Sequence, residues 1–464
     1  MSGFKPYPAY KDSGVEWLGE VPEHWVVKQL RYLGRFRKGL TITKADLADT
    51  GIPCLNYGEV HSMYPFEVNQ DIQPLKSVPP EYLETDPSAC IKHGDFVFAD
   101  TSEDLDGVGN FTHVSGIEPL FAGYHTIIYS LDSEISSRFL AYCLDSFAFR
   151  TQLRLGVKGV KVFSVTQEIL RGGTAWLPTT AEQTQIARFL DHETARIDAL
   201  IKEQQRLIEL LKEKRQAVIS HAVTKGLDPT VPMKDSGVEW LGEVPAHWDV
   251  RKFYFGIKAI IDNRGRSPSY IDSGIPILEA RQLSDEAMEC SSDFGKYISE
   301  ESHSEFVRDD VAPGDVLMVT VGTIGKVGVV GENPDYVILQ NIVGFRVDDD
   351  IVSGFMGIYL KSGAAFMAMQ ATNKESILSS VKVSDFIQHK MPLPPLAEQK
   401  AIVRSVNASL SKYGVLQKEA ELLCSTLHER RSALISAAVT GKIDVRGWQP
   451  QASAPTPELA QEAV

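Results

Sequence analysis

The chain has 464 residues, a formal net charge of −14 and the composition of an ordinary globular protein. This length accommodates about two to four domains with full-sized cores. Net acidity argues weakly against nucleic acid and anionic membranes as partners, although the placement of the charges matters more than their sum.

Five cysteines are scattered along the chain, and none of them forms a C-x-x-C pair. This usage fits a reducing compartment and offers neither a disulfide framework nor a cysteine-based zinc site. The N-terminus has no apolar signal-peptide region, and no run approaches the ~18 apolar residues that span a bilayer. The sequence therefore predicts a cytoplasmic protein.

An internal duplication dominates the sequence. The twelve residues KDSGVEWLGEVP occupy positions 11–22 and return unchanged at positions 234–245, and each copy is followed by a His-Trp pair. A Gly-Asp pair at 94–95 returns at 314–315, and Ala-Glu-Gln at 181–183 returns at 397–399. Because repeats define the organisation of a chain, we predict an A–B–A′–B′ plan with two related halves.

Each A segment is predicted to be mixed α/β. Apolar, partly β-branched runs predict strands, and short helical stretches close each copy. The strands are expected at 95–100 and 124–132 in the first copy and at 315–322 and 336–348 in the second, and the helical stretches at 137–153 and 354–370.

Each B segment is predicted to be one long helix. Pro178 and Pro394 precede the two helices, Gly226 and Gly441 are plausible stops, and acidic residues occupy the first turns. Each helix has about 40–45 residues, or roughly 60–65 Å at 1.5 Å per residue. Apolar positions recur in steps of three and four, which predicts that the two helices pack on each other as a coiled coil. The apolar seam is expected at Ile186, Leu190, Ile197, Leu200, Leu207, Leu211 and Val218, and at Ile402, Val406, Tyr413, Leu416, Ala420, Leu423, Leu427 and Leu434.

A search for catalytic motifs finds none that is complete. The segment 333–336 reads NPDY and lacks the second proline of the amino-methyltransferase signature, so a turn is expected. The glycine-rich segment 321–331 lacks the spacing of a phosphate-binding loop and is expected to be a strand and a turn. The histidines have no metal-ligand spacing, and each Gly-Asp pair is expected to be a tight turn before a strand.

The opening block SGVEWLGEVPEHW, the Gly-Asp turn and the LPxxAEQ block before a long helix together resemble one family. This family is the specificity subunit of type I DNA restriction-modification systems, and the resemblance covers residues 11 to 446 in both halves. It implies an α+β fold with two mixed α/β target recognition domains joined by two long antiparallel helices in a coiled coil, with a pseudo-two-fold repeat.

The resemblance also implies the domain limits. The first target recognition domain is expected at 1–176, the first long helix at 177–228, the second target recognition domain at 229–392, the second long helix at 393–446 and a disordered tail at 447–464.

By the same resemblance, the subunit has no catalytic activity and no cofactor of its own. It reads a split double-stranded DNA site and binds two modification subunits, which carry S-adenosylmethionine and methylate adenine at N6. Restriction subunits add ATP- and magnesium-dependent translocation and cleavage.

Basic residues in the variable segments are the candidates for DNA contact, because arginine and lysine suit guanine and phosphate. The candidates are Arg35, Arg37, Lys38, Arg154, Lys158, Lys161, Arg264, Arg266, Arg281, Lys326 and Lys374. For any one of them, a solvated surface charge is the alternative.

Residues shared by the two copies are the candidates for a shared task. They are Trp17, Trp25, Glu182, Gln183, Trp240, Trp248, Glu398 and Gln399. The Glu-Gln pairs either stabilise the first turn of each helix or dock a modification subunit, and for Trp17 and Trp240 we favour maintenance of the fold.

Two other functions remain open. The chain could be a degenerate coiled-coil scaffold that binds partner protein without reading DNA. A stand-alone methyltransferase or nuclease is disfavoured by the motif search.

Overall fold

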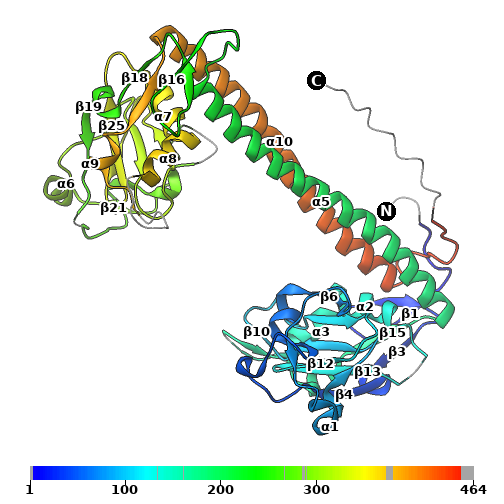
Figure 1. Ribbon diagram of the computed structural model, residues 1–464. Helices are drawn as coiled ribbons and strands as arrows, with labels where there is room; N and C mark the ends of the chain where they lie inside the picture. The colour runs from blue at the N-terminus through cyan, green and yellow to red at the C-terminus, as the bar shows by residue number, and fades with distance from the viewer. Residues whose placement is uncertain are drawn as a thin grey trace. The chain divides into compact units, whose positions relative to one another are not determined.

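A computed structural model describes residues 4–132, 134–159, 161–265, 267–284, 288, 290–371 and 380–450 (Figure 1). Arg266 and Lys374, which were predicted to contact DNA, lie outside the described residues, as does the tail from residue 451. The chain divides into two compact units: unit 1 comprises Met1–Lys202 and Cys424–Val464, and unit 2 comprises Glu203–Leu423. The predicted domain limits stay a prediction.

The main sheet of unit 1 has five strands in the order β4-β13-β9-β11-β6. Antiparallel pairing with β13 aligns the ends of β4 and β9 with the start of β13. The strands of this sheet are β4 (Gly34–Lys38), β6 (Phe66–Val68), β9 (Phe96–Ala99), β11 (Phe111–Val114) and β13 (Thr126–Leu131).

Smaller sheets complete unit 1. They are built from β1 (Tyr10–Asp12), β2 (Glu20–Pro22), β3 (Val26–Gln29), β5 (Ile52–Leu55), β7 (Ser77–Val78), β8 (Cys90–Ile91), β10 (Thr101–Ser102), β12 (Leu120–Ala122), β14 (Phe163–Ser164) and β15 (Thr174–Leu177). The helices are α1 (Tyr82–Thr85), α2 (Ser137–Asp145), α3 (Phe147–Gly156) and α4 (Gln167–Gly172), and η3 (Glu59–Met63) is a π-helical turn.

Unit 2 repeats this plan with a main sheet in the order β19-β25-β22-β23. Its strands are β16 (Met233–Asp235), β17 (Glu243–Pro245), β18 (Asp249–Lys252), β19 (Ile257–Ile261), β20 (Ile275–Leu278), β21 (Tyr297–Ile298), β22 (Val316–Val319), β23 (Val327–Val329), β24 (Val337–Ile338), β25 (Ile342–Val347) and β26 (Lys390–Leu393). Its short helices are α6 (Glu300–Phe306), α7 (Ser353–Leu360), α8 (Gly363–Ala371) and α9 (Val383–Phe386). The single strand expected at 336–348 is two strands, because the chain turns at Gln340, whose φ is 56°.

The two long helices are α5 (Thr180–Thr224), with 45 residues, and α10 (Leu396–Val439), with 44 residues. Gly226 and Gly441 follow them with φ values of 78° and 73°, which confirms their predicted role as helix stops. Each helix begins in one unit and ends in the other. Among the described helices, none is long and apolar enough to cross a membrane.

The start of α5 and the end of α10 share the core of unit 1, where Ile186, Leu190 and Ile197 cluster with Leu427 and Leu434. In unit 2 the end of α5 shares a core with the start of α10, where Ile219 and Val223 cluster with Ile402 and Val406. The two helices therefore pair in each unit, as predicted.

The predicted seam is wrong at four positions along the helices. The side chains of Leu200, Leu207, Leu416 and Leu423 are 39–46% exposed, whereas Ile201 and Gln417 are only 5–6% exposed. The less exposed positions recur in steps of four and three, at 197, 201, 204, 208, 211 and 215 on α5 and at 406, 410, 413, 417, 420, 424 and 427 on α10. Both helices therefore follow a 3.5-residue seam, and the four exposed leucines each lie one position before it.

Candidate nucleic-acid interface

A glutamine at the start of each long helix fastens that helix to its unit. In unit 1, Gln183 Nε2 donates to Pro178 O at 2.9 Å, and Gln183 Oε1 accepts from Ser136 N at 2.9 Å. The side chain is 3% exposed, and Ser136 caps α2. One amide thus joins the segment before α5 to the segment before α2.

The same arrangement recurs in unit 2. Gln399 Nε2 donates to Pro394 O and Asp350 O, both at 2.9 Å, and its Oε1 accepts from Val352 N at 2.8 Å. The chain before α7 is held as the chain before α2 is held in unit 1. These buried amides have structural partners in both copies, so helix attachment is a task that their sequence position alone did not reveal.

The neighbouring glutamates differ between the copies. Glu182 is 5% exposed and accepts hydrogen bonds from Tyr7 Oη at 2.5 Å, Trp25 Nε1 at 3.1 Å and His24 Nε2 at 2.8 Å. Burial, reinforced by the hydrogen bond to Glu182, raises the pKa of Tyr7. In unit 1, residues of the N-terminal segment therefore bury Glu182 at the start of α5 and satisfy its carboxylate with hydrogen bonds.

In unit 2, His247 Nε2 lies 2.9 Å from Glu398, and the Glu398 side chain is 26% exposed. The indole nitrogen of the buried Trp248 has no hydrogen-bond partner among the described residues. The position that corresponds to Tyr7 carries Thr230, which is exposed and bonds Asp228. The helix start in unit 2 is therefore less completely bonded.

The repeated tryptophans divide into two kinds. Trp25 and Trp248 are 0–1% exposed and belong to the cores of their units. Trp17 is 41% exposed, and Trp240 packs at the margin of the core of unit 2. Trp25 and Trp248 therefore contribute fully to the cores of their units, whereas Trp17 and Trp240 contribute only in part.

Both Gly-Asp pairs are turns before a strand, as predicted. Asp95 accepts from Lys92 N at 3.1 Å and pairs with Arg37 at 3.2 Å, and Asp315 accepts from Ala312 N at 2.7 Å and pairs with Arg346 at 2.8 Å. Both aspartates are nearly buried.

Arg37 has further structural partners, because it donates to Ser88 O at 2.5 Å and Ser130 Oγ at 2.7 Å. Its guanidinium is therefore occupied within unit 1. The nearby Arg35 is largely exposed and pairs with Asp132 at 3.0 Å.

The other described candidates of unit 1 gather at one edge of its main sheet. We define the loop edge of unit 1 as residues 38–42, 100–109, 123–126, 157–159 and 161–168, at the side of the sheet where β4 and β9 end and β13 begins. Lys38 ends β4, and Lys158 and Lys161 lie in the loop before β14; all three are exposed. Arg154 reaches the same edge and bonds Asp106 at 3.2 Å.

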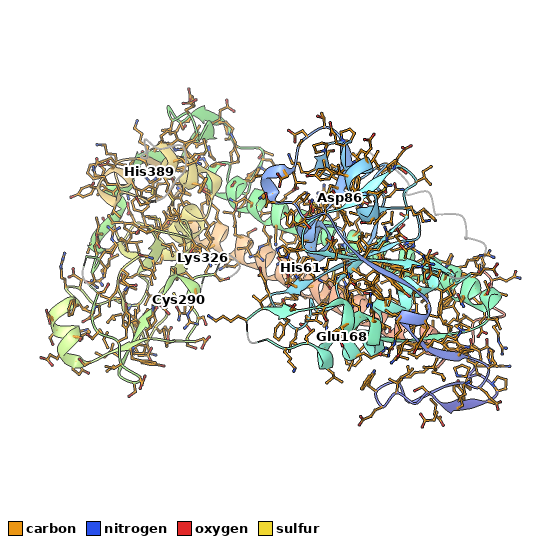
Figure 2. All side chains as sticks on the ribbon, turned by 90° about the horizontal axis from the view of Figure 1, so that it is seen from below. His61, Asp86, Glu168, Cys290, Lys326 and His389 are labelled. Atoms are coloured by element: carbon orange, nitrogen blue, oxygen red, sulfur yellow. The ribbon has the colours of Figure 1, made fainter. Side chains whose placement is uncertain are left out.

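Several of these segments line a pocket of about 640 Å³, whose walls include Lys38, Tyr124, His125 and Arg171. Glu168, labelled in Figure 2, lies on α4 at the same pocket. Asp100, Glu103, Asp104 and Asp106 also belong to the loop edge, so its charge is mixed. Acidic side chains can accept from cytosine N4 in a base-reading surface.

Unit 2 has an equivalent edge. We define its loop edge as residues 262–265, 267–271, 279–281, 320–326 and 339–341, at the ends of β19 and β22 and the start of β25. Arg264 donates to Thr320 Oγ1 at 3.0 Å and pairs with Asp262 at 2.7 Å. Lys326, labelled in Figure 2, comes from the β22–β23 loop.

Arg281 lies beside the same edge and pairs with Glu279 at 3.2 Å. Together with Lys296, Gln340 and Asn341 it lines a pocket of about 310 Å³. The structure thus brings Arg264, Arg281 and Lys326 to the edge of unit 2 that corresponds to the edge carrying Lys38, Lys158 and Lys161 in unit 1. A contact of any of these residues with DNA stays a prediction.

The polar, uncharged residues of these edges, including His125 and Gln340, are not among the candidates predicted from the sequence. A search for basic residues alone passes over amides, although glutamine and asparagine suit adenine. Among the described residues, no group of three or more His, Cys, Asp or Glu side chains could hold a metal ion.

Comparison with known proteins gives a consistent result. The family described as "Type I restriction modification DNA specificity domain" matches residues 274–412. The EcoKI specificity subunit of Escherichia coli K12 is 23% identical over 445 residues, covering 93% of this chain and 91% of that protein. The EcoBI specificity subunit of Escherichia coli is 23% identical over 335 residues, covering 68% of each chain.

Two solved structures share the fold. One was described in work on the complex assembly and conformational transition of the type I restriction-modification system; it has a TM-score of 0.67 at 16% identity and covers 91% of this chain and 99% of its own. The HsdS subunit of Thermoanaerobacter tengcongensis has a TM-score of 0.50 at 17% identity and covers 91% of this chain and 98% of its own. The predicted fold class is confirmed, and over most of its length the chain is similar to specificity subunits of type I DNA restriction-modification systems.

Proposed function

We propose that this chain gives a type I restriction-modification complex its DNA sequence specificity. It reads a two-part target, and each unit reads one half. The bases between the halves are not specified.

The observation that carries this proposal is the contrast between what the units share and where they differ. The helix attachments through Gln183 and Gln399 are alike in bonding and burial. The loop edges carry different residues, such as Lys38 and His125 in unit 1 and Arg264 and Gln340 in unit 2. Two units that attach to the helices in the same way but have different loop edges suit a target with two different half-sites.

The two long helices connect the units. Each helix connects one unit to the other, so the units are joined twice. A protein with two heads on one face of DNA places its half-sites about one helical turn, or ~34 Å, apart. The proposed target is therefore gapped and asymmetric.

The chemistry belongs to other subunits in this proposal. Two modification subunits bring S-adenosylmethionine and methylate adenine at N6, and restriction subunits bring ATP- and magnesium-dependent cleavage. This chain contributes DNA reading and docking, and no catalytic group of its own. The support is the resemblance of the full chain to named specificity subunits.

Methylation mapping tests the proposal. The chain is co-expressed with its neighbouring modification subunit in a host without adenine methylation, and the genome is sequenced for N6-methyladenine. We expect one gapped motif with a methylated adenine on each strand. If the two subunits are soluble and associated but no motif appears, the chain is a scaffold that does not read DNA.

A further inference from the structure

Two polar residues at the loop edges have an unusual backbone. His125 has a φ of 54° and Gln340 has a φ of 56°, values that non-glycine residues seldom adopt. Phe66 is the third such residue in the described part of the chain. Strained backbone of this kind gathers at sites that contact ligands.

The two residues occupy similar places in the two units. His125 directly precedes β13, and Gln340 lies two residues before β25. The carbonyl of His125 accepts from Asp100 N at 3.1 Å, and the carbonyl of Asn341 accepts from Thr320 N at 2.7 Å. In each unit, the turn therefore faces the first residue after the neighbouring strand.

Both side chains are exposed, yet each is held in place. His125 Nδ1 lies 3.2 Å from Asp100 Oδ1. Gln340 Nε2 donates to Ser267 Oγ at 3.3 Å and to the Tyr270 hydroxyl, and Lys296 Nζ lies 5.0 Å from the centre of the Tyr270 ring. An exposed side chain normally loses rotamer freedom when it binds a ligand, and this loss costs free energy. The contacts of His125 and Gln340 already restrict their rotamers, so less is lost on binding.

The groups that remain available are acceptors. Gln340 Oε1 has no hydrogen bond among the described residues, and the amide nitrogen is engaged. The Asp100 carboxylate can only accept, so His125 Nδ1 is the donor and Nε2 of the neutral ring is an acceptor. In the major groove, the donors that such atoms meet are the exocyclic amino groups of adenine N6 and cytosine N4.

A purely structural turn does not account for these side chains. Glycine fills a left-handed turn without strain, whereas here polar side chains project at pockets of about 640 Å³ for His125 and about 310 Å³ for Gln340. The exposed Asn341 adds a second amide beside Gln340.

We infer that His125 and Gln340 are specificity-determining residues, each accepting a hydrogen bond from the amino group of one adenine or cytosine in its own half-site. This inference rests on the proposed function and deepens it. The long hydrogen bond from Gln340 to Ser267 can be exchanged for one to adenine N7, which makes adenine a two-bond partner.

The test uses the purified complex of the full chain with its modification subunit. Gln340→Gly and His125→Gly remove the side chains without adding backbone strain, so thermal stability is expected to stay unchanged or rise. Gln388→Ala is the matched control, because Gln388 is exposed in unit 2 and bonds Lys252 through its side chain.

Binding is measured on duplexes in which each base pair of the mapped motif is replaced in turn. The wild-type complex is expected to lose affinity by about tenfold or more at a position read by Gln340, and the Gln340→Gly complex to bind the original and replaced duplexes alike there. His125→Gly is expected to do the same at one position of the other half. The identity of the base at each position separates adenine from cytosine.

Three results overturn the inference. The glycine variants keep full discrimination at every position, or they lose affinity equally for all duplexes, as a structural role requires. In the third, the wild-type complex discriminates at no position, and then the proposed function fails first.

Discussion

At the scale of residues, the clearest role of the shared Glu-Gln pairs is to attach each long helix to its unit through hydrogen bonds. Gln183 and Gln399 each satisfy backbone groups from two separate segments, and both amides are buried. A buried group that loses its partner costs the full desolvation of that group, about 1–3 kcal/mol.

We therefore predict that Gln183→Ala lowers the free energy of unfolding by about 1–3 kcal/mol, because Ser136 N–H and Pro178 C=O lose their partner. Gln399→Ala has an effect of the same size. Gln205→Ala, on the exposed face of α5, is the control and changes stability by less than about 0.5 kcal/mol. Chemical denaturation measures all three, and equal stability of Gln183→Ala and the control contradicts the role in helix attachment.

The glutamates should behave unequally. Glu182 accepts three side-chain hydrogen bonds, and Glu398 accepts one. We expect Glu182→Ala to cost at least about 1 kcal/mol more in unfolding free energy than Glu398→Ala, since bonds to a charged group contribute about 1.5–3 kcal/mol. Tyr7→Phe in the wild-type background should cost part of this difference, because it removes one of the three hydrogen bonds to Glu182. If both alanine variants lose the same unfolding free energy, the additional hydrogen bonds of Glu182 do not stabilise the start of α5 in unit 1.

Acid should weaken unit 2 through His389. Burial lowers the pKa of His389 from 6.5 to about 4, and its ring lies between the Tyr359 hydroxyl at 2.9 Å and Phe386 O. Between pH 4 and 6.5 the unfolded chain binds the proton that the folded chain excludes, so stability is complete above 6.5 and falls with acidification.

At pH 5, this residue is expected to remove about 2 kcal/mol of stability relative to pH 7. His389→Gln should reduce the fall between these pH values, whereas His221→Gln, at an exposed site on α5, should leave it unchanged. Calorimetry at both pH values measures the difference. His113 in unit 1, whose pKa burial also lowers to about 4, maintains a residual slope in the variant.

The sequence could place residues at shared turns and helix starts, but it could not assign their partners. The Gly-Asp turns and the helix-stopping glycines were predicted correctly, since local backbone geometry fixes them. The partner of Asp95 comes from β4 and that of Asp315 from β25, so the matching arginines stand on different strands. Tertiary pairing of that kind leaves no local signal.

At the scale of elements, the long helices were predicted almost to the residue, and their buried stripe was not. The buried stripe follows a regular heptad, but neighbouring apolar residues such as Leu200 and Ile201 both fit a spacing of three or four, and only Ile201 is buried. Gln340 likewise divides a run that reads as one strand. The spacing of apolar residues therefore predicted which segments are helices and strands. It did not predict which of two neighbouring apolar residues is buried, or where a strand is interrupted.

Packing along α10 gives a prediction at this scale. Ile402 is fully buried in the core of unit 2, whereas Val415 on the same helix is 55% exposed. Ile402→Ala should lower the unfolding free energy by about 2–5 kcal/mol, and Val415→Ala by less than about 0.5 kcal/mol. Thermal and chemical unfolding compare the two. Equal effects would mean that the helix pair is not held by this stripe.

At the scale of the whole molecule, the duplication repeats one fold plan in two units, and the proposed function gives each unit its own DNA-reading surface. Sequence comparison within the chain showed this plan, because the shared blocks recur in the same order. The bases that each unit is proposed to read could not be predicted, since each loop edge is built from side chains of several separate loops. The central claim is that the two units read separate halves of one target.

Exchange of residues 229–392 for the matching segment of a relative, followed by mapping of N6-methyladenine, tests this claim most directly. We expect one half of the gapped motif to change to that of the relative, while the other half and the gap stay as they were. A change in both halves together would contradict it.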